Sequence, residues 1–254
     1  MNKQLESYPH LVRLAEEGYD FHLSDYISKG VDFFKQDIGG FVSYTLLFFL
    51  ISMAAGFVPF GSVLVGPPLA MGWAIVCYHI LKDKHTQFNE FFKGFDHFGQ
   101  LILVTLIMGL LMMLVIIPAI LIFGFSTGLF INGEPDLDGG NGVMLFVGIL
   151  ALLAPVIYMA IAWAWAPYFV VFHGMKFWDA MEASRKILSK NWWSFFGFYL
   201  IIGLITVSGF IALGVGALFT IPIAYCAQFA AFADVVQLER ADASHASIED
   251  HLVE

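Results

Sequence analysis

Long runs without charged residues alternate along this chain with shorter segments that carry the charges. No Asp, Glu, Lys or Arg occurs in residues 39–81, 99–133, 139–175 or 191–233. Because a helix needs about twenty apolar residues to cross the hydrocarbon core of a bilayer, each run has room for at least one crossing. Barrel strands would alternate polar and apolar positions over about ten residues, and the runs lack that alternation. The pattern predicts an all-α, polytopic integral membrane protein.

Six transmembrane helices are predicted within these runs. They cover Ile38–Phe57, Val63–Leu81, Phe98–Phe125, Val143–Phe172, Trp193–Ala212 and Phe219–Val236. The third and fourth are longer than a bilayer requires, since about thirty helical residues span about 45 Å and the hydrocarbon is only about 30 Å thick. We expect them to tilt, to kink at Pro118, Pro155 or Pro167, or to project outward as a helical hairpin.

Positive charges set the predicted orientation of these helices. The chain has 12 Lys and Arg residues, and none lies in the connections Pro59–Ser62, Asn132–Gly142 and Ala212–Thr220. Because loops that face the cytoplasm collect Lys and Arg, the six crossings are predicted to form three hairpins with both termini in the cytoplasm. Short loops further favour the cytoplasmic membrane of a bacterial cell.

An amphipathic segment precedes each predicted hairpin. The three segments are Ser24–Asp37, Thr86–His97 and Met175–Lys190. A helix with one apolar and one charged face is suited to lie flat at the lipid headgroups, and it is also suited to pack under a helical bundle. The sequence leaves open whether these helices bind a partner or only lipid.

The chain is therefore predicted to repeat one unit: an amphipathic segment, a membrane helix, an uncharged turn and a second membrane helix. The units that make up the membrane domain 24–238 are about residues 24–85, 86–174 and 175–238. Residues 1–23 are predicted as a polar cytoplasmic N-terminus, and residues 239–254 as an acidic cytoplasmic tail.

Composition and charge agree with a membrane protein. Hydrophobic residues make up 59% of the chain and charged residues 13%, whereas a soluble domain carries about a quarter charged residues. The net charge of −9 argues against nucleic acid as a partner, because phosphates require a basic surface. Cys77 and Cys226, both in predicted membrane helices, are interpreted as small buried apolar residues rather than as a disulfide or redox pair.

Residues 166–195 read APYFVVFHGMKFWDAMEASRKILSKNWWSF. This segment resembles the membrane domain attached to some bacterial glycerophosphoryl diester phosphodiesterases and related bacterial multipass families. The shared features are a proline-led helix end, a helix with Ala-x-x-x-Ser (Ala180 and Ser184) and an aromatic return to the membrane. The run LSDYISKGVDFFKQDIGGF at residues 23–41 is similar to a variant in such proteins. The resemblance covers roughly residues 20–238 and implies a six-helix membrane domain. It transfers no catalytic residue, because the phosphodiesterase chemistry belongs to a separate soluble barrel.

Two groups of residues were considered as metal sites. The first consists of histidines near the predicted cytoplasmic loops, namely His79, His85, His97 and His173. A tetrahedral site needs three or four converging ligands, and no HExxH-type spacing occurs, so we expect histidines without a metal. The second group lies in the predicted outer loop and contains Glu134, Asp136, Asp138 and Asn141. Calcium loops end in a bidentate Glu that is missing here, so a solvated turn is the simpler interpretation, and ion binding by this loop stays open.

The remaining polar residues suggest no reaction. Hydroxyls in or near the crossings (Ser62, Ser126, Ser208, Thr105 and Thr206) lie outside any G-x-S-x-G motif and are expected to hydrogen-bond between helices. Asp234, close to the predicted cytoplasmic boundary, is expected to reach the headgroups. The sequence predicts no catalytic, cofactor-binding or metal-binding residue and no cofactor.

Three functions compete. The favoured one is a non-enzymatic membrane module that binds membrane lipids or a partner, either a further copy of the chain or another membrane protein. The alternative is a transporter or channel for a small or lipid-like solute, and ion coupling is disfavoured because the crossings hold no charged group at mid-membrane. The third is a membrane lipid enzyme that would use the histidines and acids at the cytoplasmic edge.

Overall fold

The computed structural model describes residues 8–84, 86–126, 140–211 and 214–238. All elements in these ranges are helical, and six of the helices are long and apolar enough to cross a membrane. The prediction of an all-α polytopic membrane protein with six spans is confirmed.

Five of the six predicted crossings agree with the observed helices to within two residues at each end. The observed membrane helices in chain order are α4 (Ile38–Gly56), α5 (Gly61–Leu81), α6 (Phe98–Ser126), α8 (Gly140–Ala162), α11 (Trp192–Ile211) and α12 (Ala217–Val235). Five prolines lie inside these helices, at Pro67 and Pro68 in α5, Pro118 in α6, Pro155 in α8 and Pro222 in α12. The remaining helices are α2 (Pro9–Glu17), α3 (Leu23–Gln36), the 3₁₀ helix η1 (Phe88–His97), α9 (Ala166–His173) and α10 (Phe177–Lys190).

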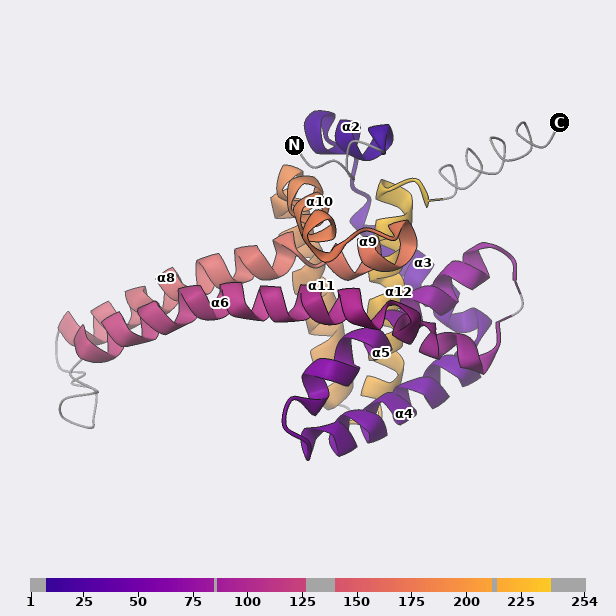
Figure 1. The fold of residues 1–254 in the computed structure, drawn as a ribbon, viewed down its shortest axis with the longest axis horizontal. Helices are drawn as coiled ribbons and strands as arrows, with labels where there is room; N and C mark the ends of the chain where they lie inside the picture. The colour runs from indigo at the N-terminus through magenta and orange to yellow at the C-terminus, as the bar shows by residue number, and fades with distance from the viewer. Residues whose placement is uncertain (1–7, 85, 127–139, 212–213, 239–254) are drawn as a thin grey trace.

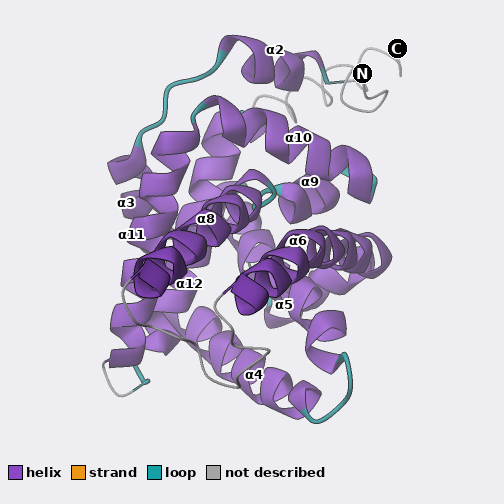
Figure 2. Ribbon diagram, turned by 90° about the vertical axis from the view of Figure 1, so that its left-hand side faces the viewer, coloured by secondary structure: helices purple, strands orange, loops and turns teal. Residues whose placement is uncertain are grey.

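The long helices α6 and α8 lie side by side and project as a hairpin from a body that contains α5, α11 and α12 (Figures 1 and 2). Large apolar side chains along the hairpin are exposed, among them Leu110, Leu114, Ile122, Val143 and Phe146. An uninterrupted apolar surface of this kind is unfavourable in water and is normal for helices surrounded by lipid chains. Of the three ways in which the sequence allowed these long helices to fit, the structure shows outward projection.

The predicted fourth crossing consists of two helices with a break beside Pro167, one of the three prolines at which a kink was expected. α8 ends at Ala162, and α9 begins at Ala166. Pro167 has no backbone N–H to donate to the preceding turn, so the helix loses a hydrogen bond there. The hydroxyl of Ser184 in α10 bridges the break: it accepts a hydrogen bond from Trp165 N at 3.1 Å and donates one to Ala162 O at 2.8 Å. Ser184 is fully buried and therefore joins three helices at one point.

Replacing Ser184 with alanine is expected to destabilise the folded chain by about 1–3 kcal/mol, because a buried N–H and a buried carbonyl lose their partner. The change can be measured as the shift in the free energy of unfolding in mixed micelles, followed by circular dichroism. Ser189→Ala is the matched control on the same helix, since the Ser189 hydroxyl contacts Tyr158 OH in an exposed position. Equal effects of the two substitutions would show that Ser184 does not bridge the break.

Two of the amphipathic segments form helices that run alongside membrane helices rather than across their ends. α3 is antiparallel to α12, with Tyr26 beside Asp234 near one end and Phe34 beside Phe219 near the other. Between these points the two backbones approach closely, because a Cβ atom at Gly30 would lie 2.6 Å from the backbone nitrogen of Ala227. Such an approach is open only to glycine.

The 3₁₀ helix η1 packs on α5 in the same antiparallel manner. Glu90 near its start pairs with His79 near the end of α5, and Gly94 lies directly against the carbonyl oxygen of Pro68, about two turns into α5. The buried ring of Phe91 stacks on Tyr44 of α4, with the ring centroids 4.4 Å apart. Within this amphipathic segment Phe91 is thus covered by protein, whereas Phe88 and Phe95 are exposed.

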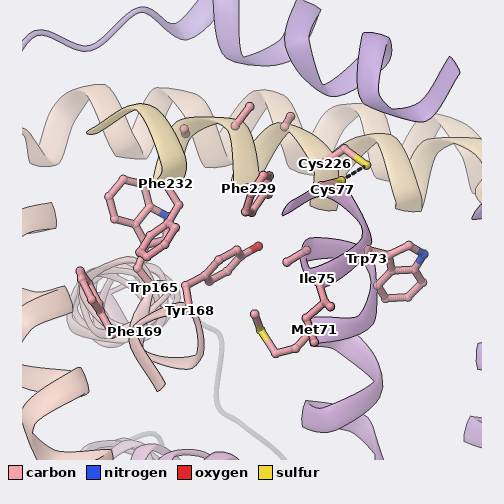
Figure 3. Close-up of a cluster of buried hydrophobic side chains, with 14 of the residues drawn as sticks. Met71, Trp73, Ile75, Cys77, Trp165, Tyr168, Phe169, Cys226, Phe229 and Phe232 are labelled. Carbon is pink, nitrogen blue, oxygen red and sulfur yellow. Dashed lines mark hydrogen bonds between the residues drawn. The ribbon is translucent and has the colours of Figure 1, made fainter. Parts of the chain in front are cut away.

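The core of the body is aromatic and lies between α5, α9 and α12 (Figure 3). Trp165, Tyr168, Phe169, Phe229 and Phe232 pack together on one side of it. The buried state predicted for Cys77 and Cys226 is confirmed, and both thiols are free. Beyond that prediction, the two sulfur atoms touch at 2.9 Å and join α5 to α12.

Candidate functional site

A cavity of about 640 Å³ lies at the end of the molecule where α2, α3 and the C-terminal part of α12 meet. Its volume falls in the range of about 300–1,000 Å³ that is common for ligand sites. The lining side chains come from three distant parts of the chain: Leu14, Tyr19, Asp20, His22, Lys29, Phe33, Leu81, Ala230, Ala233, Asp234, Val235 and Gln237. This is the site at which the structure brings charged groups and apolar groups together around open space.

The cavity is amphipathic. The side chains of Phe33, Ala230 and Val235 are buried and supply apolar wall, whereas Lys29 and Asp234 are exposed and lie at its open side. A site with apolar walls and a charged opening matches a molecule that has an apolar part and a charged head.

The charged opening is organised by three residues. Lys29 Nζ lies 3.6 Å from Asp234 Oδ1, and the hydroxyl of Tyr26 donates a hydrogen bond of 2.8 Å to Asp234 Oδ2. Burial, and then the hydrogen bond to the carboxylate, raise the pKa of Tyr26, so its hydroxyl stays protonated and continues to donate at neutral pH. Asp234 was expected to reach the headgroups, and the structure adds that it pairs with Lys29 and Tyr26 of α3.

The segment between α2 and α3 contributes Tyr19, Asp20 and His22 to the cavity lining. It is hydrogen-bonded to α10 and to Asn191, the residue between α10 and α11. Tyr19 OH donates to Ile187 O at 2.9 Å, and Asn191 Nδ2 donates to Tyr19 O at 2.6 Å. Burial raises the pKa of Tyr19, which keeps this donor protonated. Leu11 of α2 is fully buried, so part of the segment predicted as a polar N-terminus packs into the body.

Of the histidines considered for a metal site, the three that the structure describes (His79, His97 and His173) do not lie in a cluster with two further ligands. His79 Nδ1 contacts Oε2 of Glu90, whose other oxygen lies 3.5 Å from Lys93 Nζ. Within the described ranges no three side chains of His, Cys, Asp or Glu converge. His85 and the acidic residues Glu134, Asp136 and Asp138 of the predicted calcium loop lie outside the described residues, as does the side chain of Asn141.

Three of the hydroxyl groups considered in the sequence, those of Thr105, Thr206 and Ser208, do not bond between helices as expected. Thr105 donates to Leu101 O, Thr206 to Ile202 O and Ser208 to Ile205 O, each within its own helix. Serine and threonine in helices commonly satisfy their hydroxyls on the carbonyl three or four residues earlier, which removes the need for a partner helix. These residues therefore provide neither helix contacts nor a nucleophile at the cavity.

Sequence reasoning found Asp234 but not the cavity around it. Asp20, His22 and Lys29 carried no signal of their own, because charged residues before a membrane helix are ordinary. Comparisons of the chain with protein-family models, with curated proteins and with solved structures find no match. The site is thus interpreted from its own geometry.

Proposed function

We propose that this chain is a non-enzymatic lipid-binding module of the bacterial cytoplasmic membrane, and that it holds a phospholipid in the cavity between α2, α3 and α12. The observation that carries the proposal is the amphipathic lining: buried apolar walls from Phe33 and Ala230 beside the charged pair of Lys29 and Asp234. A phospholipid offers the complementary combination of acyl chain and charged headgroup.

The position of the cavity supports this function. It lies by the C-terminal end of α12, at the end of the molecule where α2 and α10 are found (Figure 1). Arg13 of α2 and Arg185 and Lys186 of α10 are among the positive charges from which the cytoplasmic side is predicted. This is the level at which headgroups meet the ends of membrane helices. A carrier would need a path to the opposite face, and the lining residues of this cavity belong to α2, the segment after it, α3, the end of α5 and the C-terminal part of α12.

Filling the cavity is expected to abolish lipid retention. Ala233 lines the cavity and is half-buried, so Ala233→Trp places a large ring in the space that the lipid would occupy. Native mass spectrometry of the full chain, purified in a mild detergent, should show one retained phospholipid on the unmodified protein and at least about a tenfold smaller fraction on the variant.

The matched control is Ala54→Trp, because Ala54 is exposed on α4 and lies outside the cavity lining. This variant should retain lipid like the unmodified chain. Retention by Ala233→Trp at the level of the control, or no retained lipid on any of the three proteins, would overturn the proposed function.

A further inference from the structure

The cavity lining carries more negative than positive side chains, and this difference affects which phospholipid headgroup would fit. The lining contains one lysine, Lys29, and two aspartates, Asp20 and Asp234, together with the exposed ring of His22. An anionic headgroup would be attracted by one lysine and repelled by two carboxylates. A headgroup that carries both a phosphate and an ammonium has a partner for each kind of charge.

We infer that the cavity selects phospholipids with a phosphoethanolamine headgroup, whose phosphate would face Lys29 and whose primary ammonium would face the carboxylates of Asp234 and Asp20. This inference rests on the proposed function, because it names the lipid for the same site. It follows from charge complementarity, which discriminates between partners more strongly than it adds affinity.

The ion pair at the opening is suited to exchange partners with such a headgroup. Lys29 and Asp234 are 3.6 Å apart, and their side chains are 54% and 42% exposed. An ion pair in so exposed a position contributes little to stability. When the headgroup enters, its phosphate replaces Asp234 beside the lysine and its ammonium replaces Lys29 beside the aspartate, so no charge is left without a partner.

Tyr26 keeps the aspartate in place during this exchange. Its hydroxyl holds Asp234 Oδ2, and the tyrosine itself is fully buried. The other carboxylate oxygen, Oδ1, is the one that faces Lys29 and that becomes available to an ammonium. A primary ammonium has three N–H donors for carboxylates, whereas the trimethylated nitrogen of a choline headgroup has none. Phosphatidylcholine is therefore disfavoured although its net charge is the same.

A competition experiment tests the selectivity. The full chain in detergent is exchanged into an equimolar mixture of dioleoyl phosphatidylethanolamine, phosphatidylglycerol and phosphatidylcholine, and bound lipid is counted by native mass spectrometry. Phosphatidylethanolamine should be enriched roughly tenfold over each of the other two, the ratio expected from one charge-assisted hydrogen bond.

Asp234→Asn should bring the enrichment close to unity, because the amide keeps an oxygen for Tyr26 and removes the negative charge. Asp32→Asn is the matched control: Asp32 is an exposed acid of α3 that pairs with Lys35 and lies outside the cavity lining. Circular dichroism in the same detergent confirms that both variants are folded. If Asp234→Asn is not folded, Asp20→Asn replaces it, and a reduced enrichment is again expected.

The outcomes separate the two proposals. If no lipid of any class is retained, the proposed function fails and the selectivity fails with it. If lipid is retained without preference, or with a preference for phosphatidylglycerol or phosphatidylcholine, the lipid site stands and the headgroup assignment is overturned. An enrichment that persists in Asp234→Asn overturns the assignment of the ammonium to this carboxylate.

Discussion

Replacing Gly30 with valine is expected to destabilise the folded chain by at least about 2 kcal/mol, within the range for overpacked interiors. A Cβ atom at this position would lie 2.6 Å from the backbone nitrogen of Ala227 and 2.7 Å from its Cα. Backbone atoms cannot rotate away as the end of a flexible side chain can, so α3 must move away from α12. The measurement is the free energy of unfolding in mixed micelles, followed by circular dichroism.

The separation of α3 from α12 should also remove bound lipid. Tyr26 and Lys29 lie one turn or less from Gly30 and meet Asp234 only while the helices are in contact. Any lipid retained by the unmodified chain should therefore be lost in Gly30→Val under conditions where the protein is still helical. This loss would distinguish a displaced α3 from general unfolding.

Gly39→Val is the matched control for this substitution. Gly39 lies near the start of α4 and has no other atom within 4 Å of the position that a Cβ would take. Valine also has a better helix propensity than glycine, so the control should be neutral or slightly stabilising. If Gly30→Val unfolds no more easily than Gly39→Val, then α3 does not pack on α12 at Ala227.

The membrane helices could be predicted from the sequence because a helix that crosses the hydrocarbon core needs about twenty apolar residues in a row. Charged residues flank every apolar run, as Asp37 does before Ile38 and Lys82 does after Leu81. Inside lipid, the backbone N–H and C=O groups of a segment must hydrogen-bond to each other, which a helix achieves. The observed start of α4 and the observed end of α5 accordingly fall beside these charges. Pro167 was one of three candidate positions for a kink, and the charge pattern could not choose among them, since the side chain that stabilises the break, Ser184, is about twenty residues further along the chain.

The candidate site was not predictable because its parts are brought together only by tertiary packing. Periodicity shows that one face of residues 24–37 is apolar, but it does not show what covers that face. The structure shows that α12 covers it, with Phe33 against Phe229. Leu14, Leu81 and Gln237 then line one cavity, although more than 60 residues separate each from the next.

Trp73→Ala is expected to have the second large effect, a loss of about 3 kcal/mol in the free energy of unfolding, which is the lower end of the range for truncating a large buried aromatic side chain. The lower end applies because helices in lipid gain little from transfer out of water, so the cost is mainly lost packing and a cavity. Trp73 is fully buried and stacks on Tyr225 of α12, with ring centroids 4.5 Å apart. Its indole N–H also donates to Thr45 Oγ1 of α4 at 3.2 Å.

The same measurement on Trp193→Ala provides the comparison, because Trp193 is 78% exposed at the start of α11. Its truncation removes a side chain that faces the surroundings rather than the core, and the free energy of unfolding should change by less than about 1 kcal/mol. Trp73→Phe should lie between the two, since it keeps a ring on Tyr225 and removes only the donor to Thr45. A cost for Trp73→Ala no greater than that for Trp193→Ala would mean that α4, α5 and α12 do not meet at this tryptophan. The aromatic core described for the body would then be wrong.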